Sequence, residues 1–76
     1  MIQITVGVSG TKEPLTFGDN LERILDFQED ICEPHVIQPD KLDTLYIRAD
    51  HNYHFITGNS VYIVAGAMLG YVEIKR

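Results

Sequence analysis

The segment FGDNLERILDFQEDI, residues 17–31, decides the fold class that the sequence predicts. Its apolar residues recur three or four positions apart, the spacing that places side chains on one side of an α-helix. These residues are Phe17, Leu21, Ile24, Leu25 and Ile31. Two overlapping capping patterns mark its start, Thr16 with Asp19 and Asp19 with Glu22. Glu33 and Pro34 end it, because the residue before a proline avoids helical angles. The segment therefore predicts one amphipathic helix.

The regions on either side of this segment have the alternating pattern of β-strands. Residues 2–8 alternate apolar and polar, and turn residues at 9–12 lead to a short second strand at 14–17. The proline-containing stretch 32–43 predicts a loop, in which a short extended piece at Val36 and Ile37 is the alternative. Further strands are predicted at 45–49, 53–57, 61–65 and 71–75. The predicted fold class is α+β, with one amphipathic helix packed on a mainly antiparallel sheet of four to five strands; a β-grasp-like order also fits.

Length and composition indicate one folded domain. The 76 residues have room for one hydrophobic core, so we predict a single α+β domain over residues 1–76. A chain this short buries a modest share of its surface, and a homodimer is one way to gain stability. Cys32 is the single cysteine, so no intramolecular disulfide can form. No signal peptide and no apolar run long enough to cross a bilayer are found. We therefore expect a cytoplasmic protein without a membrane span.

The negative charge is concentrated in the predicted helix. The chain carries a net charge of −5, which disfavours direct nucleic-acid binding because phosphates are bound by lysine and arginine. Six carboxylates fall within one arc of the helix, opposite its apolar side. These are Asp19, Glu22, Asp26, Glu29, Asp30 and Glu33. Like charges at this spacing destabilise a helix, which favours a role in binding, although an acidic face also serves solubility.

The first hypothesis follows from this acidic stripe, which is the arc of six carboxylates on the predicted helix. It describes a small acidic, non-enzymatic binding protein that mimics the charge of nucleic acid and blocks a basic, nucleic-acid-binding host protein. Inhibitors of this type are found among phage and mobile-element proteins. The acidic residues would then form the partner-binding site.

The tyrosines support a second hypothesis. Tyr46, Tyr62 and Tyr71 have the strand parity opposite to their apolar neighbours, so they are predicted to share the outer face of the sheet with Arg48. Tyrosine provides a large amphipathic contact area, which suits an interface, and it is also a good strand former. The alternative function is therefore a structural or oligomerising interaction module that uses this tyrosine-bearing face.

Cysteine and histidine residues carry a third, more distant hypothesis. An enzyme or metal protein would use Cys32, His35, His51 and His54. Their spacing matches no recognised zinc pattern, and a nucleophile needs a base within hydrogen-bond reach. The glycines at 58, 66 and 70 lack the lysine and the strand-to-helix junction of a phosphate loop. We therefore predict no catalytic residue, no metal and no cofactor.

Overall fold

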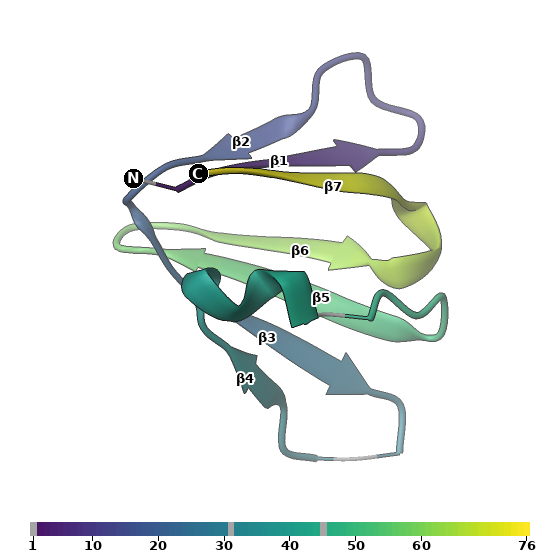
Figure 1. Cartoon of the computed structure of the whole chain (residues 1–76). Coiled ribbons are helices and arrows are strands. Elements are labelled where there is room, and N and C mark those ends of the chain that lie inside the picture. The colour runs from purple at the N-terminus through teal and green to yellow at the C-terminus, as the bar shows by residue number, and fades with distance from the viewer. Residues whose placement is uncertain (1, 31, 45) are drawn as a thin grey trace.

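The computed structural model describes residues 2–30, 32–44 and 46–76 and consists of two antiparallel β-sheets that form two layers (Figure 1). The smaller sheet has the order β2-β1-β7, with β1 (Gln3–Val8), β2 (Leu15–Phe17) and β7 (Leu69–Lys75). The larger sheet has the order β4-β3-β5-β6, with β3 (Leu21–Gln28), β4 (His35–Ile37), β5 (His51–Thr57) and β6 (Val61–Ala65). Two short 3₁₀ helices are η1 (Pro39–Thr44) and η2 (Gly66–Met68). None of the helices described is long and apolar enough to cross a membrane.

The predicted α+β fold class is wrong, because residues 17–31 do not form an amphipathic helix. Their central part is β3, which pairs with both β4 and β5. A register shift between Leu21 and Arg23 inserts one extra residue in β3 opposite β5. This bulge lets Leu21 and Ile24 both point into the core although they are three positions apart. The strand thus reproduces the spacing of a helix. Ile31, which completed the predicted apolar side, lies outside the described residues.

The other predicted strands agree with the structure in most places. Strands expected at 2–8, 14–17, 53–57 and 61–65 correspond to β1, β2, β5 and β6. The last one, at 71–75, corresponds to β7. The strand predicted at 45–49 is wrong for residues 46–49, which lie outside any strand, and Leu45 is not among the described residues. Two facing sheets replace the single sheet and the β-grasp-like order.

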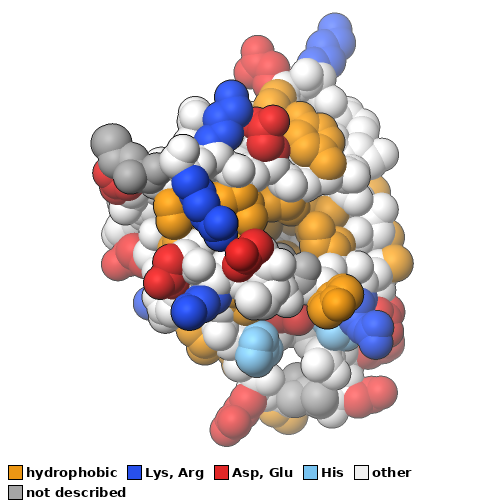
Figure 2. Space-filling model, in the orientation of Figure 1, with side chains coloured by type: hydrophobic (Ala, Val, Ile, Leu, Met, Phe, Trp, Pro, Cys, Tyr) orange, Lys and Arg blue, Asp and Glu red, His pale blue; other side chains and the backbone are white. Residues whose placement is uncertain are grey.

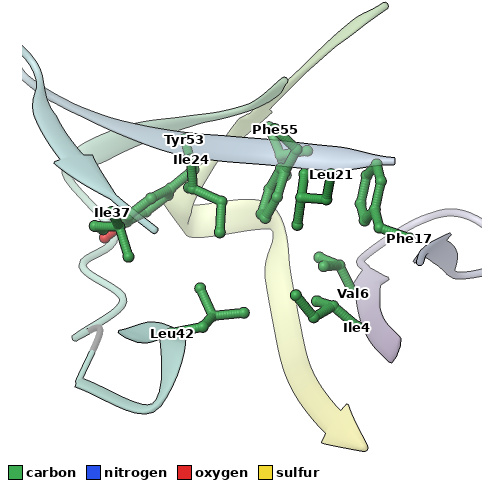
Figure 3. Packing of buried hydrophobic residues seen from close by; sticks show 10 residues of the cluster. Ile4, Val6, Phe17, Leu21, Ile24, Ile37, Leu42, Tyr53 and Phe55 are labelled. Atoms are coloured by element: carbon green, nitrogen blue, oxygen red, sulfur yellow. The ribbon is translucent and has the colours of Figure 1, made fainter. Parts of the chain in front are cut away.

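The hydrophobic core lies between the two sheets (Figure 3). Tyr53 and Phe55 of the larger sheet and Val6 of the smaller sheet are essentially inaccessible to solvent. The ring of Phe17 stacks on that of Phe55 with 5.4 Å between centroids. Leu42 projects from η1 into the same cluster. Burying each such side chain stabilises the fold by about 1.5–3 kcal/mol, so this layer contact is the main source of stability.

The pairing register divides the side chains of the larger sheet between two faces. We call the side that packs on the smaller sheet the inner face and the opposite side the outer face. Ile24 pairs with Ile37 and Phe55, and this row lies on the inner face. The next residue, Leu25, pairs with Val36 and His54, so that row lies on the outer face. Every strand of this sheet therefore contributes to both faces.

Candidate functional site

A polar pocket of about 570 Å³ opens where the apolar part of the inner face ends. Its polar lining consists of Asp26, Gln28, His35, Thr44, Arg48 and His51. Strand pairing sets most of this arrangement, because Asp26 of β3 is opposite His35 of β4, and Gln28 is opposite His51 of β5. The pocket therefore gathers residues that are up to 25 positions apart in the chain.

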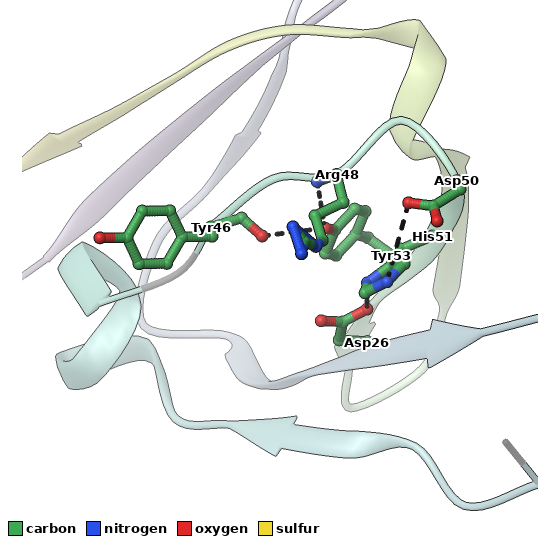
Figure 4. Close-up of polar contacts among 6 residues, drawn as sticks. All are labelled: Asp26, Tyr46, Arg48, Asp50, His51 and Tyr53. Carbon is green, nitrogen blue, oxygen red and sulfur yellow. Dashed lines mark hydrogen bonds and ion pairs between the residues drawn. The ribbon is translucent and has the colours of Figure 1, made fainter.

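A buried hydrogen bond between a histidine and a carboxylate lies in this pocket (Figure 4). His51 Nδ1 and Asp26 Oδ1 are 2.8 Å apart, and about nine-tenths of each side chain is buried. Because a carboxylate only accepts hydrogen bonds, the Nδ1–H group of His51 is the donor. The other ring nitrogen, Nε2, lies 3.8 Å from Asp50 Oδ1. Burying a carboxylate is unfavourable unless it is hydrogen-bonded, so His51 is what allows Asp26 to occupy the inner face.

Tyr53 ties the segment before β5 to the core. Its hydroxyl accepts a hydrogen bond from the backbone N–H of Arg48 at 2.7 Å and donates one to the carbonyl oxygen of Tyr46 at 3.1 Å. Burial raises the pKa of the Tyr53 hydroxyl, so the neutral form that makes both hydrogen bonds is favoured. A side chain at Gly66 would collide with the carbonyl oxygen of Arg48. These contacts hold Tyr46 and Arg48 at the rim of the pocket.

The pocket has only part of what nucleophilic catalysis requires. A histidine oriented by a carboxylate is one half of a catalytic triad, and the other half is a nucleophile within hydrogen-bond reach. No hydroxyl or thiol in the described part of the chain is hydrogen-bonded to His51. The hydroxyl of Thr44 donates to the carbonyl oxygen of Lys41 instead, and Cys32 is exposed. The pocket is suited to holding a polar group, and the predicted lack of enzymatic activity stays a prediction.

The histidines and the cysteine do not form a metal site in the part of the chain that the structure describes. Among these residues, no three side chains of His, Cys, Asp or Glu lie close enough together to bind one ion. His54 lies on the outer face, with its ring centroid 4.3 Å from that of Phe27. His35 and His51 line the polar pocket from the inner face. The sheet therefore separates His54 from the other two.

The acidic residues do not form the predicted stripe. Asp26 is buried on the inner face, whereas the other five carboxylates are exposed. Asp19 and Glu22 lie near the start of β3, and Glu29, Asp30 and Glu33 lie in the connection between β3 and β4. Six residues of β3 lie between Glu22 and Glu29, so these two side chains are attached about 23 Å apart along the strand. Acidic side chains surround the lower end of the molecule in Figure 2, where Figure 1 places that connection.

The tyrosines predicted to share one face lie in three different environments. Tyr62 is on the inner face of β6, with its ring edge against Phe17 at 5.4 Å. Tyr71 belongs to the smaller sheet, where its ring covers Gly7. Tyr46 is 85% exposed and lies outside the strands. Of the predicted interface residues, only Tyr46 and Arg48 come together, at the polar pocket.

The outer face of the larger sheet is the surface that the sequence reasoning missed. Leu25 is opposite Val36 and His54, and His54 is opposite Ile63, so one row crosses all four strands. Val36, Val61 and Ile63 are 50%, 54% and 67% exposed, although all three are apolar. Half-buried apolar side chains on the same face are Leu25, Phe27 and Ile56. Apolar side chains at consecutive positions of β3 were the available signal, since a strand with two apolar faces is normally covered on both.

Comparisons with known proteins assign no family. No protein-family model matches this sequence, and comparison with curated proteins and with solved structures finds no significant similarity. The function is therefore inferred from the residues of the chain itself.

Proposed function

We propose that this chain is a non-enzymatic interaction protein that binds a protein partner through the outer face of its larger sheet. The observation that supports this proposal is the row Val36–Leu25–His54–Ile63 across the outer face, in which the apolar residues Val36 and Ile63 are at least half exposed. Folded monomers rarely leave a contiguous apolar patch on their surface unless it binds something. The proposed role is a form of the interaction-module hypothesis, with a different face of the sheet as the contact.

The shape and composition of the outer face favour a protein over a small molecule. Small ligands are bound in concave pockets, whereas this surface is formed by one side of a sheet. The exposed charged side chains of its strands, Glu22 and Arg23, lie together in the bulge at one end of β3. Protein interfaces have centres depleted in charge and enriched in aromatic residues, and Phe27 is such a residue. A partner with its own apolar surface suits these features.

We assign a structural role to the polar pocket. Asp26 and His51 satisfy each other where the core ends, and Tyr53 holds the neighbouring segment. Loss of these contacts would alter both faces of the larger sheet, because β3 and β5 contribute side chains to the inner face and to the outer face. The pocket then supports the interaction surface without contacting the partner.

The nucleic-acid-mimic hypothesis stays a prediction, and its test needs a variant that leaves the fold intact. Its helical stripe is absent and Asp26 is buried, so a variant at Asp26 would disturb folding. The suitable variant is Glu29→Gln/Asp30→Asn/Glu33→Gln, which neutralises exposed carboxylates only. If the hypothesis holds, capture of basic proteins from a nuclease-treated lysate at low salt is lost in this variant. Equal capture by both proteins would contradict it.

A cytoplasmic location is also part of the proposal. Cys32 is exposed, and an exposed free thiol is best kept reduced in the cytoplasm.

Site-specific photocrosslinking in the producing cell tests the proposed interaction surface. A photoreactive residue at Ile63 should give discrete adducts, because Ile63 is the most exposed apolar residue of the outer face. The matched control is Thr16, which is exposed on β2 of the other sheet. Adducts that are no stronger at Ile63 than at Thr16 would overturn the proposal.

A further inference from the structure

We propose that the partner is a second copy of this chain, packed outer face to outer face with the two β3 strands antiparallel. This inference rests on the proposed function and adds the identity of the partner and its orientation. A two-fold axis between the two faces makes each surface contact its own copy, which is the commonest symmetry of soluble oligomers.

The distribution of charge determines the orientation. Glu22 and Arg23 lie together near the start of β3, so their charges offset each other there, whereas Glu29 and Asp30 follow directly after the end of β3. Within the described residues Arg23 has no carboxylate within 4.0 Å. An axis perpendicular to the strands brings each Arg23 towards the acidic end of the partner's β3. An axis parallel to the strands would bring the two acidic ends together, which is unfavourable.

The centre of the contact is mainly apolar. With Arg23 opposite Glu29 of the second copy, Leu25 of one copy packs on Phe27 of the other, and Ile63 packs on Ala65. His54 of one copy faces Asn52 of the other, so a polar pair lies between these apolar contacts. Two sheets packed face to face lie about 10 Å apart, which these side chains can fill.

The size of the outer face predicts a reversible dimer. Four strands spaced by about 4.8 Å, with about five residues of 3.4 Å each, cover roughly 320 Å² in projection. Side chains make the accessible surface larger than its projection, so two copies together bury on the order of 1,000 Å², the lower limit for a specific interface. The dimer should therefore dissociate on dilution.

Sedimentation velocity of the purified chain over a dilution series tests this inference. The expected result for the unmodified protein is a monomer–dimer equilibrium. Ile63→Lys should weaken the dimer at least tenfold, because it buries a charge in the contact. Thr16→Lys adds the same charge to the other sheet and should leave the equilibrium unchanged. Circular dichroism of each variant checks that the fold is retained.

A charge-reversal cycle tests the orientation. Arg23→Glu places like charges opposite each other and should weaken the dimer about tenfold at low salt, as should Glu29→Lys/Asp30→Lys. Combining all three substitutions restores opposite charges and should restore the dimer. A parallel orientation predicts no such restoration, so its absence overturns the antiparallel arrangement.

Two further outcomes separate this inference from the proposed function. If the unmodified chain stays monomeric at every concentration while Ile63 still gives specific crosslinks, the second-copy inference is wrong and the interaction surface stands. If the chain dimerises but Ile63→Lys has no effect, the dimer uses another surface and the inference is also overturned. Monomeric protein without specific crosslinks at Ile63 overturns both.

Discussion

The inner and outer faces of the larger sheet are built from the same strands, yet they have opposite environments. On β6, Val64 is 7% exposed on the inner face, whereas its neighbour Ile63 is 67% exposed on the outer face. Both residues are apolar and both belong to the same ladder with β5. The difference arises because the smaller sheet and Leu42 cover the inner face. Alternation assigns residues to a face, and only the second layer determines whether that face is buried.

Truncating one side chain on each face gives the largest expected contrast. Phe55→Ala should lower the free energy of unfolding by about 3–5 kcal/mol, because it removes a buried ring that stacks on Phe17. Ile63→Ala should change it by less than about 0.5 kcal/mol in the monomer, where that side chain is exposed. Urea unfolding at high dilution measures both values. Similar losses for the two variants would mean that the outer face is covered within one chain.

The polar end of the inner face should be the next most sensitive position. Asp26→Ala leaves the Nδ1–H group of His51 without its acceptor, so we expect a loss of about 1.5–3 kcal/mol. Glu29→Ala removes an exposed carboxylate and should change stability by less than about 0.5 kcal/mol. Urea unfolding at neutral pH compares the two variants. Equal effects would contradict a structural role for the Asp26–His51 contact.

Tyr53 offers a smaller effect with a characteristic pH dependence. Tyr53→Phe removes the hydroxyl between Arg48 and Tyr46 and should cost about 1 kcal/mol at neutral pH. Because burial raises the pKa of Tyr53, its contribution is complete below the unfolded pKa of about 10 and is lost as pH rises through the higher folded pKa. Above about pH 10, the unmodified protein should therefore lose stability more steeply than Tyr53→Phe. Urea unfolding across this range tests the prediction, which parallel curves would contradict.

An ion pair outside both faces should have the smallest effect. The hydrogen bond from the Arg76 guanidinium to Asp43, at 3.0 Å, holds the pKa of the Asp43 carboxyl below its usual value. Arg76→Gln should return that pKa towards the usual value, which a carbon-detected NMR titration of Asp43 measures. Its contribution to stability is present above the usual pKa and disappears as pH falls through the lowered one. Because both side chains are exposed, high salt should also raise the pKa of Asp43 in the unmodified protein. A salt-independent pKa would contradict this description.

The strands bounded by turn residues could be predicted from the sequence, and the central one could not. Residues 53–57 and 61–65 are rich in β-branched and aromatic residues and lie between turn residues, so β5 and β6 were recognisable. β3 contains a bulge, which moves its inward residues to a spacing of three and imitates a helix. Local periodicity cannot detect the partner strand that makes a bulge necessary.

The candidate sites depended even more on long-range contacts. Asp26 belonged to an acidic stripe only if its segment was helical, and strand pairing instead placed it opposite His35 and beside His51. Tyr62 was expected to face outwards with the other tyrosines, but Phe17 of another strand holds it on the inner face. In both cases the deciding contact is between residues that are far apart in the chain.

What the sequence by itself determined is the set of local features: a small acidic chain, its strand-forming segments, its turns and its lone cysteine. Those follow from composition and from side-chain alternation, which depend on neighbouring residues only. The tertiary structure alone decided that β3 is a strand, that Asp26 is paired with His51, and that the outer face remains uncovered. These depend on which strands pair and which layers stack, because burial and hydrogen bonding between distant residues are properties of the assembled sheets.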